Sequence, residues 1–192
     1  MPDSRRCFVA IDPGSRVLGL AALAPDRGAP GVGLRVLESR SLPVNGRTSI
    51  ERLCSAGLAV ETFMQEHRPD AAAWEEGYLG ANIQTGLFLA ELRGIVIYTT
   101  KKYCGHVVGG QRGEVLSCLG VVVPMLARGE AKRIGAEEAA RRRRHNNDAL
   151  KFAVRRRVQQ LLILEDLPLE DEADALALGI WLAERESSKV PF

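Results

Sequence analysis

Short apolar runs separated by turn residues predict strands in the first part of the chain. Residues 7–11 form a continuous apolar run, which is typical of a strand buried on both faces. The run ends at the turn Asp12-Pro13-Gly14-Ser15, where proline fixes φ and glycine permits backbone angles that other residues avoid. The same kind of run predicts further strands at residues 17–23, 34–39, 71–74 and 105–108.

Apolar positions three and four residues apart predict helices in the rest of the chain. The first begins at Ser49, which we expect to cap it, and ends near His67 because Arg68-Pro69 disfavours helix. Further helices are predicted at residues 82–99, 114–126, 136–144, 147–162 and 171–183. Three antiparallel strands followed by alternating helices and strands predict an α/β fold, a mixed sheet with helices on its faces.

Length and composition fit one globular domain. The chain has 192 residues, 46% of them hydrophobic and 26% charged, which is too apolar for a disordered protein. No apolar run approaches the roughly 18–20 residues that cross a bilayer, and no signal peptide is recognisable. The four cysteines lie far apart without a C-x-x-C pair. We therefore expect reduced thiols in a cytoplasmic protein rather than a zinc site or disulfides.

The net charge of +2 hides a strongly basic segment. Residues 128–157 hold eleven Lys/Arg against four Asp/Glu, and the rest of the chain has an excess of five acids. A basic block on an otherwise acidic chain favours a surface that binds a polyanion. The alternative is an ordinary solvated helix face, which is the commoner meaning of a charge run taken alone.

Four carboxylates are candidates for one shared site. Asp12 and Glu75 each follow a predicted buried strand, and parallel neighbouring strands would bring both to one edge of the sheet. Asp171 and Asp174 are three residues apart, so both lie on one face near the start of the last helix. If that helix packs at the same edge, the four acids meet in one cleft and need a counter-charge. Hard oxygen ligands suit Mg²⁺, with Mn²⁺ as a substitute.

Each acid also has a simpler interpretation. Asp12 suits a turn, Glu75 a solvated strand end, Asp171 the N-terminal turn of a helix and Asp174 a salt bridge. Their joint placement beside a basic block favours the metal site. Two ions about 3.5–4 Å apart would activate a water molecule and stabilise the leaving oxygen of a phosphodiester, with a nearby Lys or Arg stabilising the developing charge.

Three segments, in order along nearly the whole chain, resemble the RuvC family of Holliday-junction resolvases. The first is Ile11-Asp12-Pro13-Gly14-Ser15-Arg16-Val17 with Gly19, which resembles the family's opening strand and turn. The second is Trp74-Glu75-Glu76-Gly77-Tyr78, followed by Leu92-Arg93-Gly94 on a helix. The third is Asp171-Glu172-Ala173-Asp174-Ala175-Leu176-Ala177, at the family's spacing from Lys151.

The resemblance implies an RNase H-like fold with a five-stranded mixed sheet and helices on both faces. It also implies a homodimer that resolves four-way DNA junctions by paired, metal-dependent nicks. Asp12, Glu75, Asp171 and Asp174 would be the metal-binding catalytic acids, and Lys151 would stabilise charge near the scissile phosphate. Tyr78 takes the place of an aromatic that stacks at the junction crossover; a buried or rim tyrosine is the alternative, and stacking on a base would contribute about 1–3 kcal/mol.

The chain departs from the family in a longer basic stretch. We expect it to be a helical insertion, about residues 114–146, within the single domain 1–192. Such an insertion indicates a divergent or phage-encoded member, in which case the compartment is the host cytoplasm; a cellular member would be associated with the nucleoid. The basic residues expected to contact DNA are Arg141, Arg142, Arg143, Arg144 and Arg155.

Two alternative functions remain open. One keeps the nuclease chemistry on flaps, other branched DNA or structured RNA. The other is a module that binds junctions without cutting them, which the presence of all four acids argues against.

Overall fold

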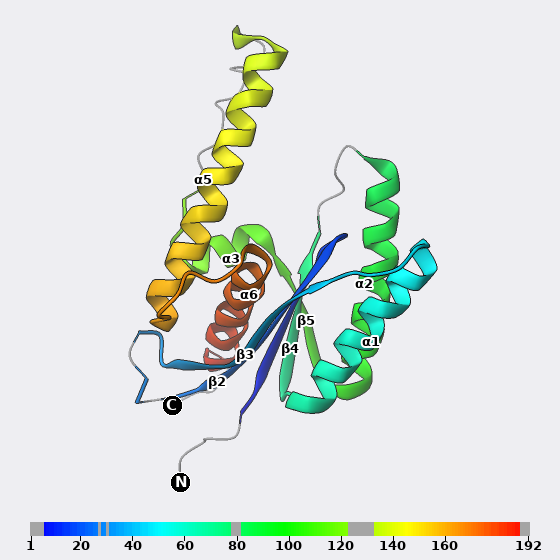
Figure 1. Cartoon of the computed structure of the whole chain (residues 1–192). Helices are drawn as coiled ribbons and strands as arrows, with labels where there is room; N and C mark the ends of the chain where they lie inside the picture. The colour runs from blue at the N-terminus through cyan, green and yellow to red at the C-terminus, as the bar shows by residue number, and fades with distance from the viewer. Residues whose placement is uncertain (1–5, 27, 30, 78–81, 123–132, 189–192) are drawn as a thin grey trace.

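Five strands form one mixed sheet at the centre of the protein (Figure 1). The computed structural model describes residues 6–26, 28–29, 31–77, 82–122 and 133–188. The strand order is β3-β2-β1-β4-β5, with β1, β2 and β3 antiparallel and β1, β4 and β5 parallel. The strands are β1 Phe8–Pro13, β2 Val17–Pro25, β3 Leu34–Pro43, β4 Ala71–Glu76 and β5 His106–Gln111. The predicted five-stranded mixed sheet is confirmed.

Helices cover both faces of the sheet, as predicted (Figure 1). Helices α1 (Ser49–His67) and α2 (Ile83–Tyr103) lie on one face. On the other face lie α3 (Arg112–Cys118), α5 (Ala136–Leu162) and α6 (Glu170–Ser187). The residues of β1 alternate between the two layers: Val9 and Ile11 pack toward α1 and α2, and Phe8 and Ala10 pack toward α6.

The ends of two helices differ from the prediction. Thr48, rather than Ser49, caps α1: its side chain accepts a hydrogen bond from the Glu51 N–H, and the Glu51 carboxylate accepts one from the Thr48 N–H. This reciprocal pair is a capping box, which requires the acid three residues after the cap. Helix α3 stops at Cys118, well before the predicted end near residue 126, because Gly120 adopts a positive φ of 67°.

A single helix replaces the two that were predicted for residues 136–144 and 147–162. Helix α5 runs without a break over 27 residues, since neither glycine nor proline interrupts it. The predicted break at Asn147 was wrong because an asparagine mid-helix can point its side chain outward instead of capping.

The two halves of α5 have different surroundings. The second half carries Leu150, Val154, Val158 and Leu162, which are buried against the rest of the domain. The first half extends past the sheet on the side where β1 ends (yellow in Figure 1), and Ala139 is its one buried residue among those described. We call residues 136–149 the α5 arm. No helix in the described part of the chain is long and apolar enough to cross a membrane.

Candidate active site

Two carboxylates meet where β1 and β4 end. The strands run parallel with Ile11 beside Trp74, so Asp12 and Glu75 come next on each strand. Ile11 and Trp74 belong to the core under α1 and α2. Because side chains alternate along a strand, Asp12 and Glu75 point to the opposite face, toward α6. The sequence prediction that these two acids converge is consistent with this register.

Helix α6 brings its acids to the same edge. Gly19 on β2 pairs with Asp12, and a Cβ built at Gly19 would lie 2.1 Å from the backbone oxygen of Asp171. Glycine therefore lets the first turn of α6 approach the sheet directly beside Asp12. The Asp171 carboxylate accepts a 3.4 Å hydrogen bond from the Ser41 hydroxyl of β3, and Ser41 is opposite Gly19 in the sheet.

The acids perturb one another strongly. Burial, followed by the charge of Glu75 and a hydrogen bond with its carboxyl group, raises the pKa of Asp12 well above its ordinary value. The charges of Asp174 and Asp171 raise it further. Burial also raises the pKa of Asp174 from 3.8 to about 6, although the positive charges of Arg112 and Lys151 lower it. This accumulation of partly buried negative charge calls for a cation.

Arg112 is a component of the site that the sequence prediction did not include. It begins α3 directly after β5, and its Nη1 lies 3.3 Å from Oε1 of Glu75. Arg112, Glu75 and Asp174 line one small cavity of about 20 Å³, which has room for about one water molecule. The sequence contained a weak signal, because Arg112 lies in a glycine-rich segment that follows a predicted strand.

Lys151 lies at the rim of the site. It contacts the Glu170 carboxylate, at the start of α6, and its charge acts on Asp174. Arg155, which was expected to contact DNA, donates a 2.7 Å hydrogen bond from Nε to the carbonyl of Pro168. That bond fixes the connector between α5 and α6, and through it the start of the acid-bearing helix. Tyr78 lies outside the described residues.

The chemistry of these donors fits a hard divalent cation. Asp12, Glu75, Asp171 and Asp174 supply oxygen ligands only. Among the described residues, however, no three of them bring their ligand atoms within 4.8 Å of one another. Binding a metal ion would therefore require these side chains to draw closer, which rotation of aspartate and glutamate side chains allows.

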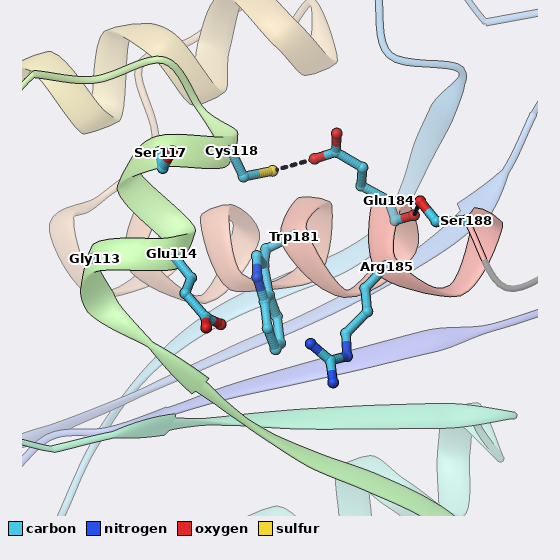
Figure 2. A pocket seen from close by; sticks show the side chains of 8 residues that line it. All are labelled: Gly113, Glu114, Ser117, Cys118, Trp181, Glu184, Arg185 and Ser188. Atoms are coloured by element: carbon cyan, nitrogen blue, oxygen red, sulfur yellow. Dashed lines mark hydrogen bonds between the residues drawn. The ribbon is translucent and has the colours of Figure 1, made fainter.

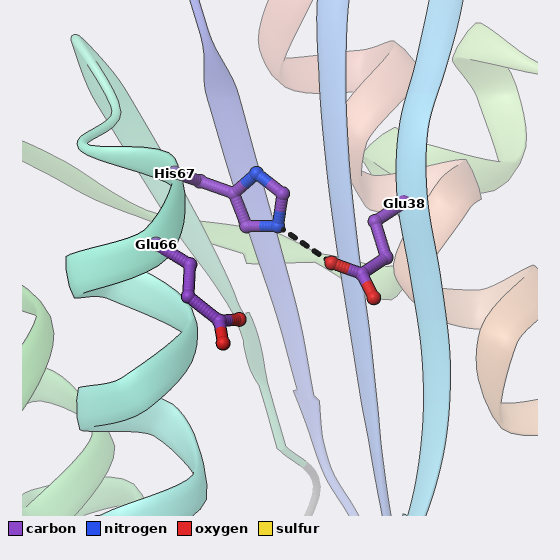
Figure 3. A group of neighbouring side chains, drawn as sticks. All are labelled: Glu38, Glu66 and His67. Atoms are coloured by element: carbon purple, nitrogen blue, oxygen red, sulfur yellow. Dashed lines mark hydrogen bonds and ion pairs between the residues drawn. The ribbon is translucent and has the colours of Figure 1, made fainter.

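The one described cluster that meets this distance lies elsewhere, between β3 and α1 (Figure 3). It consists of Glu38, Glu66 and His67, with His67 Nε2 3.0 Å from Glu38. The guanidinium of Arg40 already neutralises this cluster, because it contacts Glu38 at 2.6 Å and Glu66 at 2.9 Å. The cluster is an ion-pair network that ties α1 to β3.

A groove between α3 and α6 also lies away from the acids (Figure 2). Its volume is about 530 Å³. Cys118 donates a 2.7 Å hydrogen bond to Glu184 across it, and the Arg185 guanidinium lies 5.4 Å from the centre of the Trp181 ring. Cys118 and Arg185 are therefore engaged with Glu184 and Trp181, so the groove does not repeat the cluster of negative charge found around Asp12.

The fold and the acid-bearing edge define the class of the protein. A five-stranded mixed sheet with helices on both faces is the RNase H-like fold that the resemblance implied. Residues 8–108, more than half of the chain, match the family described as crossover junction endodeoxyribonuclease RuvC. The chain belongs to this family.

Curated relatives and solved structures agree with that assignment. A RuvC of Hahella chejuensis is 28% identical over 172 residues, covering 90% of this chain and 84% of its own length. A RuvC of Burkholderia cenocepacia is 28% identical over 173 residues, covering 90% and 81%.

Two solved structures share the fold. Thermus thermophilus RuvC in complex with a Holliday junction substrate superposes with a TM-score of 0.71 at 19% identity, covering 95% of this chain and 96% of that chain. The yeast mitochondrial Holliday junction resolvase Ydc2 has a TM-score of 0.55 at 12% identity, covering 97% and 82%.

Proposed function

We propose that this protein is a Mg²⁺-dependent, structure-selective endonuclease that resolves four-way DNA junctions by paired nicks. The observation that carries the proposal is the convergence of the acids at one edge of the sheet, where burial and the neighbouring acids raise the pKa of Asp12. Membership of a family of crossover junction endodeoxyribonucleases supplies the substrate class.

The roles of the residues follow from their positions. Asp12, Glu75, Asp171 and Asp174 would hold the cation, two ions in each site, with Mn²⁺ able to replace Mg²⁺. Bound divalent cations supply an activated water molecule and stabilise the leaving oxygen of the phosphodiester. Lys151, at the rim beside Glu170, would stabilise negative charge on the phosphate undergoing cleavage.

The test compares substrates and variants in one assay. Purified protein is incubated with a labelled four-way junction, a matched linear duplex and a flap, with Mg²⁺ or with EDTA. We expect symmetric nicks in the junction alone, which disappear with EDTA and in Asp174→Asn. Asp166→Asn, the same chemical change at an exposed position beyond the C-terminal end of α5, should cut normally.

Other outcomes would change the assignment. Preferential cutting of the flap would favour a nuclease for other branched DNA, and an RNA junction is added to the same assay to detect activity on structured RNA. Tight junction binding without nicking in Mg²⁺ or Mn²⁺ would favour a non-cleaving module.

A homodimer would place two such sites on one junction, because the junction has two strands to cut symmetrically. Helix α2 offers a suitable surface: Ile83, Leu87 and Tyr98 are 76%, 61% and 73% exposed. With Gly94 they lie on one face, because four and seven residues correspond to about one and two helical turns. We infer that this apolar face pairs with a second copy. Tyr98→Asp should halve the mass measured by sedimentation, whereas Asn147→Asp, which adds the same charge at an exposed position on α5, should leave it unchanged.

The α5 arm would contact a duplex arm of the junction through its arginines. Arg141 and Arg142 are held by Glu138, each at 2.9 Å. Arg143 and Arg144 have no ion pair with any residue in the described part of the chain and are exposed. Arg144 precedes Lys151 by two helical turns, so both lie on one face, about 10 Å apart along the axis. We therefore assign most of the phosphate contact to Arg143 and Arg144.

Two double variants with equal charge change test this assignment. Both are made in the Asp174→Asn background, and junction binding is measured at several salt concentrations. Arg143→Ala/Arg144→Ala should lower the slope of log affinity against log salt by up to about 1.8, or about 0.9 for each lost phosphate contact. Arg141→Ala/Arg142→Ala should lower it much less. Equal slopes for both pairs would refute the geometric argument, and slopes equal to the parent would remove the arm from the DNA interface.

A further inference from the structure

Arg112 occupies the position of a counter-ion within the acid cluster. Strand β5 pairs with β4 so that Gly110 is beside Glu75, which places Arg112 just beyond the end of β4. Its guanidinium contacts Glu75 at 3.3 Å and lines the same small cavity as Asp174. Of the charges that act on Asp174, that of Arg112 has the largest effect. One guanidinium thus acts on two of the four proposed metal ligands.

We propose that Arg112 neutralises the acid cluster before the divalent cation binds. When the cation binds, Arg112 leaves Glu75 and then contacts the substrate phosphate. This inference rests on the proposed metal-dependent nuclease function. It adds Arg112 to the site as a residue that competes with the metal ion for Glu75 and afterwards binds the substrate phosphate.

Competition follows from charge and position. A carboxylate oxygen that faces a guanidinium at 3.3 Å cannot give its full charge to a metal ion, and two cations at one carboxylate repel each other. The wide spacing of the four acids, in which no described triple comes within 4.8 Å, is what an inserted guanidinium would produce. Glu75 already shares a hydrogen bond with Asp12, and release of Arg112 frees Oε1 of Glu75 for the cation.

Transfer of Arg112 to phosphate follows from its chemistry and exposure. The planar guanidinium can donate two hydrogen bonds to a phosphate in a bidentate arrangement that lysine cannot reproduce. The Arg112 side chain is 42% exposed, so it can reach a strand lying across the site. Lys151 is engaged with Glu170 on the α5 side, so the two cations would contact the phosphate from different directions.

A structural role would have a different signature. An ion pair between partly exposed groups contributes little to stability, typically below about 1 kcal/mol. Arg112→Ala should therefore melt within a few degrees of the wild type, which circular dichroism can verify. Loss of a merely structural arginine would loosen the site and weaken metal binding, whereas loss of a competitor strengthens it.

The experiment is a calorimetric titration of Mg²⁺ and Mn²⁺ into DNA-free protein, followed by the junction nicking assay. Arg112→Ala should bind the metal about two- to fivefold more tightly, the range for removal of a partly exposed ion pair. It should nevertheless nick the junction about 100-fold more slowly, as expected for loss of a group that stabilises transition-state charge. Arg112→Lys should keep metal affinity near that of the wild type and restore only part of the nicking rate.

Arg35→Ala is the matched control, because it removes one positive charge at the opposite end of the sheet, where Arg35 pairs with Ala24. It should change neither measurement. Unchanged or weaker metal binding in Arg112→Ala would refute the competition, and an unchanged nicking rate would refute the phosphate contact. The titration contains no DNA, so it reports on Arg112 even if the wild-type protein fails to nick junctions.

Discussion

Replacing Asp174 with asparagine should stabilise the metal-free protein at neutral pH. The pKa of Asp174 is raised from 3.8 to about 6, chiefly by burial. The folded protein therefore holds a proton on this carboxyl up to a higher pH than the unfolded chain does. As pH rises from about 4 to about 6, unfolding becomes progressively easier, and above pH 6 the destabilisation is complete.

The magnitude follows from the same values. The difference between 3.8 and about 6 corresponds to at most about 3 kcal/mol, since one pKa unit is about 1.4 kcal/mol. This free-energy difference already includes the attraction of Asp174 to Arg112 and Lys151. An asparagine has nearly the same shape as a protonated aspartate and does not ionise, so Asp174→Asn escapes the destabilisation. For a domain of this size, 3 kcal/mol is about 6–12 °C in melting temperature.

The assay is urea unfolding of both proteins in EDTA at several pH values from 4 to 8. The free energy of unfolding of Asp174→Asn should exceed that of the wild type by only about 0.5 kcal/mol at pH 4 and by about 2–3 kcal/mol at pH 7.5. Added Mg²⁺ should stabilise the wild type and close the gap, because the cation binds only the folded acid cluster. Asp148→Asn, with its exposed carboxylate, should differ from the wild type by less than about 0.5 kcal/mol throughout. A gap that does not depend on pH, or a wild type that is the more stable protein at pH 7.5, would refute the electrostatic account.

Three further predictions concern the scaffold of the site. Thr48→Ala should cost about 1 kcal/mol in urea unfolding through loss of the α1 cap, and Ser49→Ala much less; equal effects would contradict the capping geometry. Gly19→Ala should displace the start of α6, since the new Cβ meets a backbone oxygen at 2.1 Å, and should therefore lower Mg²⁺ affinity in a calorimetric titration. Gly113→Ala, which meets nothing within 4 Å, is its control, and an effect as large as that of Gly19→Ala would argue against this packing. Phe63→Ala should lower the free energy of unfolding by about 3–5 kcal/mol because the ring is fully buried; a loss below 1 kcal/mol would show that the core under α1 relaxes around the cavity.

The local features of the fold were readable in the sequence. Continuous apolar runs ending at Asp12 and Glu75 specified two buried strands and the residues at their ends. The spacing of Asp171 and Asp174 specified that they share a helix face. Patterns of period two and period 3.6 determine such features because they depend on neighbours within a few residues. The same local reasoning failed at Asn147, since an asparagine is compatible with both a cap and a helix interior.

The composition of the acid cluster was decided by the tertiary structure. Arg112 enters it because β5 ends beside β4, and Ser41 reaches Asp171 because α6 crosses the sheet at Gly19. No sequence pattern marks Ser41, and only a glycine-rich segment marks Arg112, since contacts between residues separated by tens of positions depend on how closely whole elements pack. Among the described residues, Arg141 and Arg142 pair with Glu138 whereas Arg143 and Arg144 have no ion pair. This difference likewise depends on three-dimensional position, because four identical side chains in a row differ only in the direction each takes from the helix.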